Sequence, residues 1–514
     1  MTQSPLFRRE LLAAPAISTS EISSSRAWVN SWLTFPVAIG FLLLMVVMAF
    51  ALPSINEPDI WWHLRNGQQI VTTHSLPRFD HYSFTATGSP WLDHEWLSEI
   101  FYYLAYRAWG LRGIVALYSA LTLLIFEALY YLCCREGANP KTASFVAMFG
   151  ILLGSVSFGP RPLLFGWLFM LALFLILQRY AASRSRVIWI LPPMFALWIN
   201  FHGSWLFGMI VLGVFIASGF IAGEWGLVYS ERFTVAEFKT LLSVAATSVV
   251  ALFLNPFFYR LPWYPFDLMF RQKSNMNNID EWGSVDFHEI RGKFVMVLLF
   301  SIIGGAMLSR RRWKLNETVL GAFALYVALM YWRMQFFAAL VFVPLLATRI
   351  RLFPPYDVQK EKPFLNALII ALVLAAAVIW FPKQAALEQS LREKYPVAAL
   401  QFMHGRGISD HVFADYGWGG YMVWHAPEIK TFIDGRADIF VYNGVFDDYL
   451  KIVRLQKTVE LFDHYRIRYA LLSNPGPVAY FFAHNSCWRE IYSDKLAVLF
   501  ERNEAQPACA LTGK

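Results

Sequence analysis

Acidic, histidine and amide side chains gather in one polar stretch, residues 57–110, which separates two long apolar segments. Within it, Asp59, His63 and Asn66 recur at i, i+4 and i+7, which places them on one face of a helix that starts at Pro58-Asp59. A carboxylate at such a position can act as a general base that removes a proton from an incoming hydroxyl. It can equally be an N-cap that only accepts hydrogen bonds from backbone N–H groups. The local pattern supports both roles for Asp59, and they can hold together.

A second cluster, Asp93-His94-Glu95, lies in the first turn of another predicted helix, from about Asp93 to Trp109. Together with His63, these side chains offer oxygen and nitrogen ligands that suit Mn²⁺ or Mg²⁺. The zinc signature H-E-x-x-H does not occur in this stretch. Hydrogen bonding between the two loop helices explains the cluster more simply. We favour it, and a bound metal stays the alternative.

The composition determines which elements must position these residues. The 514-residue chain is 57% hydrophobic and 16% charged, with a mean hydropathy of +0.42. Soluble proteins are about one-quarter charged, so these values predict a polytopic α-helical membrane protein. The net charge of +8 lies mainly in short loops between apolar segments and does not indicate a nucleic-acid partner. The first apolar run is longer than the core of a cleavable signal peptide, which makes it the first transmembrane helix.

Eleven apolar segments approach the roughly 20 residues needed to cross a bilayer. With the polar tail 1–31 in the cytoplasm, every loop predicted inside contains Lys or Arg, as the positive-inside rule expects. The same orientation puts the first loop, 53–110, and the C-terminal segment, 382–514, outside the cytoplasmic membrane. The membrane domain is then 32–381. The predicted spans are 32–52, 111–133, 142–158, 162–180, 187–201, 203–222, 239–255, 292–309, 317–332, 334–350 and 364–381.

Four isolated arginines lie on the predicted outer side, where the positive-inside rule makes them less expected. A guanidinium can hold a phosphate through two hydrogen bonds, and the phosphate of a lipid would lie at this depth. We assign that role to Arg161 and Arg333, which flank predicted spans. The alternative for all four arginines is pairing with outer carboxylates such as Glu281, Asp286 or Glu289, and it is favoured for Arg65 and Arg291.

One histidine lies in a tight turn between two predicted spans, Asn200-Phe201-His202-Gly203. His202 is either a ligand contact or a hydrogen-bonding turn residue. The second interpretation is favoured.

After residue 381, short apolar runs alternate with helical patterns, which predicts a small α/β domain. Asp434 and Arg436 follow a predicted strand, and strand ends are where open α/β sheets place ligands. Cys487 and Cys509 share this segment, so a disulfide is permitted outside the cytoplasm, but the spacing does not establish it. The predicted strands are 411–415, 430–433, 468–472, 489–492 and 497–501, and the predicted helices are about 394–404, 446–464 and 477–484.

The first loop resembles that of the GT-C superfamily of membrane glycosyltransferases, which use polyprenyl-phosphate sugars. The resemblance rests on an acid after the first span, an Arg65/Gly67 turn, then Pro, Trp and an aromatic helix leading to Gly110. Protein O-mannosyltransferases and the lipid A aminoarabinose transferase belong to this superfamily. Many relatives carry adjacent acids where this chain has a proline between Glu57 and Asp59. The Trp61-Trp62-His63 run suggests a separate, mainly bacterial branch.

The resemblance implies that Asp59 matches the catalytic acid of the family's first loop. It also implies a lipid-phosphate donor held by outer basic residues, a glycan, lipid or protein acceptor, and a bacterial inner-membrane location. The leading hypothesis is therefore an inverting glycosyltransferase that acts on the outer face of the membrane. A non-catalytic lipid- or glycan-binding assembly protein with the same fold is the alternative. A transporter is disfavoured, because transport predicts polar residues and broken helices at the midplane of the membrane.

Overall fold

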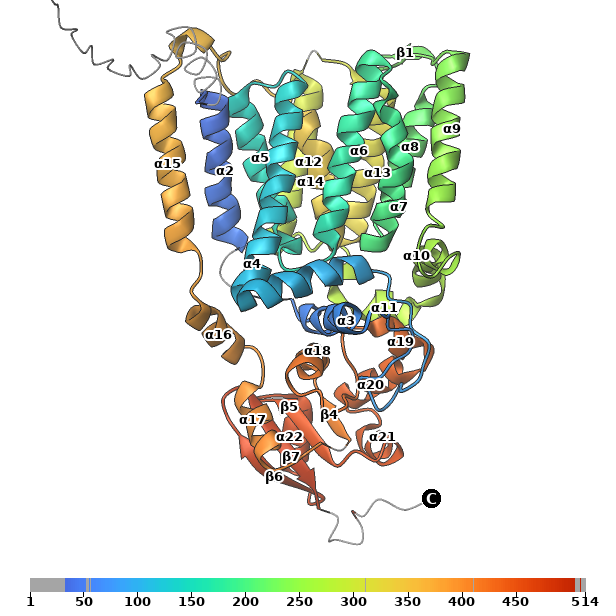
Figure 1. Cartoon of the computed structure of the whole chain (residues 1–514), viewed down its shortest axis with the longest axis vertical. Helices are drawn as coiled ribbons and strands as arrows, with labels where there is room; N and C mark the ends of the chain where they lie inside the picture. Colours follow the sequence, from blue (N-terminus) through green and yellow to red (C-terminus); the bar gives the residue numbers. More distant parts are fainter. Residues whose placement is uncertain are drawn as a thin grey trace, which may run out of the picture.

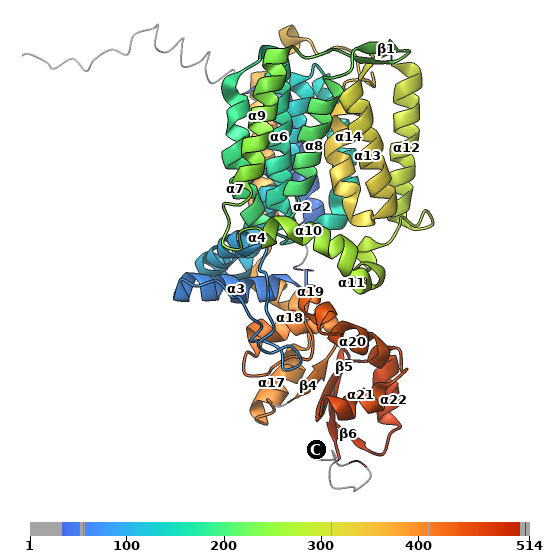
Figure 2. The same ribbon diagram turned by 90° about the vertical axis from the view of Figure 1, so that its right-hand side faces the viewer.

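A computed structural model describes residues 33–51, 55, 57–309, 311–409, 411–503 and 509. The predicted tail 1–31 lies outside these residues. A bundle of long helices forms one end of the molecule and a mixed sheet with helices forms the other, with short helices between them (Figure 1). A view turned by 90° shows the same three layers (Figure 2).

Each predicted span contains a helix of the bundle. Within the described residues, α4, α6, α12 and α15 are long and apolar enough to cross a membrane by length and composition. The remaining bundle helices are apolar but shorter. The bounds are α2 Phe35–Ala51, α4 Trp96–Arg135, α5 Pro140–Gly154, α6 Leu163–Ser183, α7 Leu191–Phe201, α8 Trp205–Ser218, α9 Val235–Ala251, α12 Ile290–Leu308, α13 Leu315–Met330, α14 Gln335–Ala347 and α15 Pro363–Trp380.

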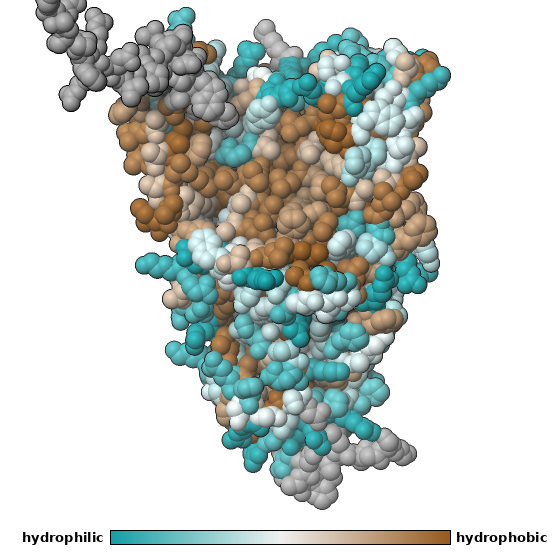
Figure 3. All heavy atoms as spheres, in the orientation of Figure 1, coloured by the Kyte–Doolittle hydropathy of each residue, from teal (hydrophilic) through white to brown (hydrophobic). Residues whose placement is uncertain are grey.

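The outer surface of the bundle is apolar. Phe364, Val378 and Leu308 expose 79–87% of their surface. The brown region that covers the bundle in Figure 3 is bounded by teal residues at its upper edge and by the polar C-terminal segment below. A continuous exposed apolar surface of this kind is unfavourable in water and is compatible with contact with a membrane. The chain is thus compatible with an α-helical membrane protein, as the composition predicts.

The first loop folds as two helices that lie across one end of the bundle (Figure 1). Helix α3 spans Ile60–Thr73, and the first part of α4 packs against it. Trp109 and Gly110 leave helical geometry, and Gly110 has φ +60°, so α4 turns sharply there into the bundle. The predicted helix end at Trp109 matches this kink. The predicted start was wrong, because α4 begins at Trp96.

The kink brings the two limbs of α4 into close contact. A Cβ added at Gly113 would lie 1.9 Å from the carbonyl oxygen of Ala105. Only glycine fits at this position, because the backbone oxygen cannot move aside without unwinding the first limb. The kink therefore fixes the angle between the limb that carries the polar residues and the limb inside the bundle.

The C-terminal segment contains a four-stranded sheet in the order β4-β5-β7-β6. The pair β4–β5 is parallel, and β7 is antiparallel to both β5 and β6. Cys487 and Cys509 form a disulfide. The strands are β4 Val412–Ala414, β5 Tyr469–Ser473, β6 Trp488–Ser493 and β7 Ala497–Arg502, and the helices are α16 Gln384–Arg392, α17 Val397–Gly405, α18 Tyr416–His425, α19 Ala437–Tyr442, α20 Val445–Val453, α21 Thr458–His464 and α22 Pro477–Ala483.

Two predictions for this segment were wrong. The predicted helix 446–464 is two helices, α20 and α21. The predicted strand 430–433 is not a strand of the sheet and forms only isolated bridges through Thr431. Its backbone instead pairs with the first loop, since Phe84 N donates to Thr431 O at 3.1 Å and Thr431 N donates to Tyr82 O at 3.1 Å. The apolar run is therefore covered by the first loop.

Short elements complete the fold at both ends of the bundle. Helices α10 Arg260–Arg271 and α11 Lys273–Asn278 and the 3-10 turns Asp280–Trp282 and Trp332–Met334 lie on the side of α3. At the opposite end, β1 Gly223–Trp225, β2 Val228–Ser230 and β3 Trp313–Lys314 form a small sheet. Both ribbon views place β1 at the end of the bundle remote from α3 (Figures 1 and 2).

Candidate functional site

Asp59 occupies the N-cap position of α3, as predicted, but its side chain makes no capping hydrogen bond. Its Oδ1 accepts a hydrogen bond of 3.0 Å from Trp62 Nε1 instead. The carboxyl is half-buried. The side chain therefore does not have the capping role considered from the sequence. Its carboxyl can act on a group other than the helix backbone.

Gly435 of the C-terminal segment lies directly over this carboxyl. A Cβ added at Gly435 would lie 1.7 Å from Asp59 Oδ1 and 3.0 Å from Trp62 Nε1. Gly420 of α18 is similarly close, since a Cβ there would lie 2.7 Å from the carbonyl oxygen of Pro58. Two glycines of the C-terminal segment therefore let its backbone approach the start of α3, so the site is built from both ends of the sequence.

Burial raises the pKa of Asp59 to about 8, and the neighbouring Glu57 adds to the effect. The hydrogen bond from Trp62 and the charge of Arg161 act in the opposite direction and only partly offset it. A carboxyl held this way is mostly protonated at neutral pH. Its proton affinity suits a group that takes a proton from a hydroxyl during a reaction.

The two arginines assigned to phosphate contact carboxylates in this structure. Arg161 is paired with Glu57 and with Glu281, the second at 2.5 Å. Arg333 Nη1 lies 3.8 Å from Glu281 Oε2, and its guanidinium lies 4.4 Å from the centre of the Trp282 ring. Arg161 is thus held between two acids, whereas Arg333 has one long ion pair and an aromatic face.

The carboxylate partners predicted for Arg65 and Arg291 were wrong. Arg65 donates to Gln68 Oε1 at 2.9 Å. Arg291 lies 4.8 Å from the centre of the Trp332 ring. Glu281, one of the acids proposed for them, pairs with Arg161 and Arg333 because the Asp280–Trp282 turn packs against the Trp332–Met334 turn.

Three histidines converge on the carboxylate of Glu95. Their Nε2 atoms lie 3.2 Å (His202), 3.6 Å (His63) and 3.7 Å (His94) from a Glu95 oxygen. Burial raises the pKa of Glu95, with the charge of Asp93 adding to it, and burial lowers the pKa of His94 to about 4. His202 also accepts a hydrogen bond from Ser204 N through Nδ1, at 2.9 Å, which is the turn role favoured from the sequence. Neutral groups suit this buried cluster, because unpaired charges would be costly there.

The two loop helices are joined by hydrogen bonds to one buried acid. His63 Nδ1 lies 2.9 Å from Glu99 Oε1, and Asn66 Nδ2 donates to the same oxygen at 3.1 Å. Asp93 is buried beside Glu99, and burial raises its pKa to about 6. Hydrogen bonds between the two loop helices are the interpretation that the sequence analysis favours over a bound metal. Among the described residues, no group of three or more His, Cys, Asp or Glu side chains is arranged to hold a metal ion.

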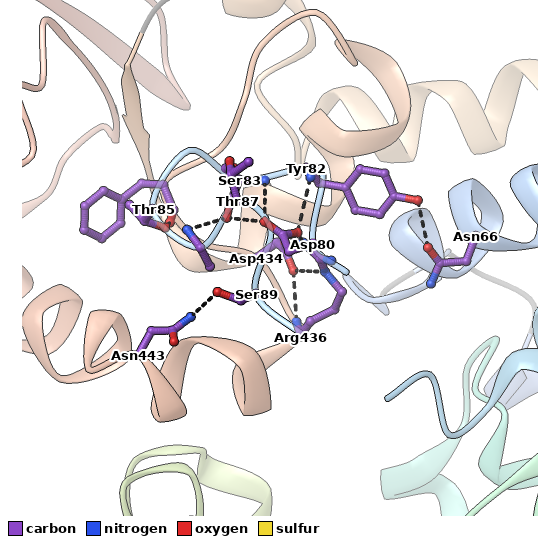
Figure 4. A network of polar contacts seen from close by, with 12 residues as sticks. Asn66, Asp80, Tyr82, Ser83, Thr85, Thr87, Ser89, Asp434, Arg436 and Asn443 are labelled. Carbon is purple, nitrogen blue, oxygen red and sulfur yellow. Dashed lines mark hydrogen bonds and ion pairs between the residues drawn. The ribbon is translucent and has the colours of Figure 1, made fainter. Parts of the chain in front are cut away.

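Arg436 joins the first loop to the C-terminal segment (Figure 4). Its fully buried guanidinium bonds Asp80 at 2.6 Å and Asp434 at 2.6 and 2.8 Å, and it lies over the rings of Tyr82 and Trp91. Burial opposes ionisation of Asp80, but the charge of Arg436 prevails and lowers the pKa of that carboxyl. Asp434 and Arg436 thus bind each other and the first loop, where the sequence suggested a ligand.

The sequence interpretation missed Glu99, Asp80, Tyr82 and Trp62. Glu99 follows Glu95 by one helical turn, so its place on the same face was a usable signal. Asp80 accepts hydrogen bonds from the backbone of Tyr82 and Ser83, a turn that the Asp-x-x-Ser spacing could have suggested. Tyr82 then links this turn to the histidine cluster by donating to Asn66 Oδ1 at 2.9 Å.

A polar cavity of about 490 Å³ opens beside α3. It is lined by Arg65, Gln68, Gln69, Thr72 and Tyr82 from the first loop, among others, and by Pro427 and Ile429 from the C-terminal segment. Amide, hydroxyl and guanidinium groups of this kind hydrogen-bond hydroxyl-rich ligands.

No protein-family model matches the chain, and no curated protein matches it at a significant level.

Proposed function

We propose that the protein is an inverting glycosyltransferase that moves a sugar from a polyprenyl-phosphate donor to an acceptor hydroxyl, with Asp59 as the general base. The observation that carries the proposal is the carboxyl of Asp59. Asp59 lies at the N-cap position of α3, but its carboxyl makes no capping hydrogen bond, stays partly accessible and has a raised pKa. The resemblance of the first loop to GT-C glycosyltransferases supports the same role.

In the proposed reaction, Asp59 removes the proton of the acceptor hydroxyl as its oxygen attacks the anomeric carbon. The new carbon–oxygen bond forms while the bond from the same carbon to the donor phosphate breaks. The polyprenyl phosphate leaves with the electron pair, so no oxidant or further reactant is needed. Because phosphate is a good leaving group, catalysis depends mainly on positioning and on cations that stabilise the departing charge.

Arg333 is the better candidate for contacting that phosphate. Its ion pair with Glu281 is 3.8 Å long and its side chain is not fully buried. Arg161 is held between Glu57 and Glu281, so a phosphate would have to displace a carboxylate from it. We assign Arg161 to holding Glu57 and Glu281 in place, and Arg333 to the donor.

A second function, a non-catalytic lipid- or glycan-binding assembly protein, is favoured by two observations. Both arginines contact acids, and Gly435 lies over Asp59. The polar cavity beside α3 would then bind the glycan. The two functions differ in whether the chain turns over a donor.

Asp59→Asn separates them, because it removes the base but keeps the size of the side chain. A glycosyltransferase should lose roughly 10²–10⁴ in single-turnover rate with nearly unchanged affinity for a polyprenyl-phosphate analogue. Asp447→Asn, at an exposed position of α20, is the matched control and should behave like the parent. Unchanged turnover in Asp59→Asn would contradict the role of Asp59, and the absence of any turnover in the parent would favour the assembly protein.

We propose the number and orientation of the membrane spans together with this function. Eleven spans place the tail 1–31 in the cytoplasm and the segment 382–514 outside a bacterial inner membrane. The support is that each predicted span contains a helix and that α3 and the C-terminal sheet lie at the same end of the bundle (Figure 1). The site would then meet a lipid-linked donor at the outer surface.

A further inference from the structure

Another cavity lies far from Asp59, at the end of the bundle that carries β1–β3. Its volume is about 500 Å³, within the range of small-molecule sites. It is lined by the ends of α4, α6, α8, α13 and α14. Nothing in the proposed glycosyl transfer uses this cavity.

The part of the cavity wall that α6, α8 and α14 provide is mainly apolar. Phe174 and Leu177 of α6, Val211 and Val214 of α8, and Leu340 and Val341 of α14 face it. Helices of this bundle present their outer surface to a membrane, so an apolar opening among their ends is accessible to lipid chains rather than to water alone. Apolar walls favour an apolar occupant, because water there lacks partners for its hydrogen bonds.

The mouth of the cavity is basic. A second cavity of about 350 Å³ shares Tyr229, Lys314 and Glu317 with the first and is otherwise lined by Arg311 and Arg312. An anionic group can therefore sit at the point where the apolar cavity opens to solvent. Basic recesses between transmembrane helices on the cytoplasmic side characteristically bind anionic lipid headgroups.

Ion pairs at the mouth engage three arginines, whereas Lys314 and Arg135 form none within the described residues. Arg311 pairs with Glu136 at 3.1 Å, Arg312 with Glu224 at 3.1 Å, and Arg349 with Glu317 at 2.5 Å. Lys314 is exposed and forms no ion pair within the part of the chain that the structure describes. Its ammonium is thus the group best placed to meet an anion at the rim.

We propose that this end of the bundle binds one anionic glycerophospholipid of the leaflet at the basic end. One acyl chain enters the apolar cavity, and the phosphate lies at the rim against Lys314, beside Arg311 and Arg312. This site is distinct from the candidate active site, and its proposal does not depend on glycosyl transfer.

The test uses the full-length protein purified in a mild non-ionic detergent. Lipids that stay bound are counted by native mass spectrometry during titration with phosphatidylglycerol or phosphatidylcholine. We expect phosphatidylglycerol to bind at least tenfold more tightly. Lys314→Gln should weaken the binding of phosphatidylglycerol by about fivefold, since a basic residue at a membrane surface typically contributes about that factor. The binding of phosphatidylcholine should stay unchanged. Lys239→Gln, an exposed lysine of α9 outside both cavities, is the matched control.

A cavity-filling variant tests the acyl chain separately. Val214→Trp places a bulky ring inside the cavity and should abolish the retained lipid without altering any charge. Val297→Trp, on the exposed surface of α12, controls for the tryptophan itself and should keep the lipid.

Three results would overturn the proposal. The first is equal affinity for the two lipids, and the second is unchanged phosphatidylglycerol binding in Lys314→Gln. The third is competition by glycerol 3-phosphate as strong as that by the lipid, because it would show a site for soluble phosphate compounds. Lys314→Gln alters an exposed side chain, so its result stands even if Val214→Trp fails to fold.

Discussion

Asp59 depends on two neighbours from distant parts of the chain. Trp62 orients its carboxyl from within α3, and Gly435 covers it from the C-terminal segment. The proximity of Asp59 to Trp62 follows from helix spacing and could be predicted from sequence. Its proximity to Gly435 could not, because no local pattern indicates which of the chain's glycines will meet a given side chain.

The pH dependence of turnover should report the ionisation of Asp59. Because burial raises its pKa to about 8, the fraction of Asp59 in the carboxylate form that acts as base rises with pH and is small below that pKa. Single-turnover rates should increase about tenfold per pH unit between pH 6 and 7.5 and level off above pH 8.5. The melting temperature, followed over the same range, serves as the check for unfolding. A rate that is flat from pH 6 to 9 would show that Asp59 is not the base.

Arg333 and Arg161 should respond differently to substitution. Arg333→Ala should weaken the binding of a polyprenyl-phosphate analogue by roughly 10- to 100-fold, because a charge-assisted hydrogen bond contributes about 1.5–3 kcal/mol. Arg161→Ala should mainly lower the melting temperature, because it leaves Glu57 and Glu281 without their shared cation. Titration of both purified variants with the analogue measures the difference. If Arg333→Ala binds like the parent, the phosphate is held elsewhere.

At the scale of elements, the lengths of the apolar segments predicted the positions of the bundle helices. A run of apolar residues long enough to cross a bilayer can adopt few structures other than a helix. Sequence patterns predicted α3 and a helix end at Trp109, which is the point where α4 kinks. They failed at residues 430–433, which form only isolated bridges through Thr431, to Ser83 of the first loop and to Val412 of β4. They also missed α18 and α19, for which no helix was predicted.

The contact between the first loop and the C-terminal segment should depend on Arg436. Arg436→Met leaves Asp80 and Asp434 as buried carboxylates without a cation, which typically costs about 3–5 kcal/mol. We expect a clear drop in melting temperature and faster protease cleavage of the first loop. Arg489→Met removes an arginine from a solvent-exposed pair with Glu501 and should change both measurements little. Equal effects of the two substitutions would show that the buried contact does not hold the loop.

At the scale of the whole molecule, polarity separates the two ends along the long axis. The bundle is apolar over its sides and the C-terminal segment is polar (Figure 3). Basic residues gather at the end with β1–β3, while the histidine cluster and Asp59 lie at the other end. Under the proposed eleven-span arrangement, the positive-inside rule would place this basic end in the cytoplasm.

Reporter fusions test that orientation directly. A reporter fused after Lys383 should be active only outside the cytoplasm, and one fused after Arg312 only inside it. An odd number of spans between these positions requires different locations. If both reporters give the same location, the eleven-span arrangement fails, and the proposed meeting of Asp59 with an outer lipid donor fails with it.

The contact between Arg436 and Asp80 also constrains the timing of biogenesis. Residues of the first loop emerge from the ribosome early, yet they bond to residues such as Asn443, which is 354 positions from its partner Ser89. Asp80 can therefore bond to Arg436 only after every intervening helix has been synthesised. A chain that stops short of residue 436 lacks both the covering glycine and the arginine. A prematurely terminated copy would therefore lack the contact of Gly435 with Asp59 and the bond of Arg436 to Asp80.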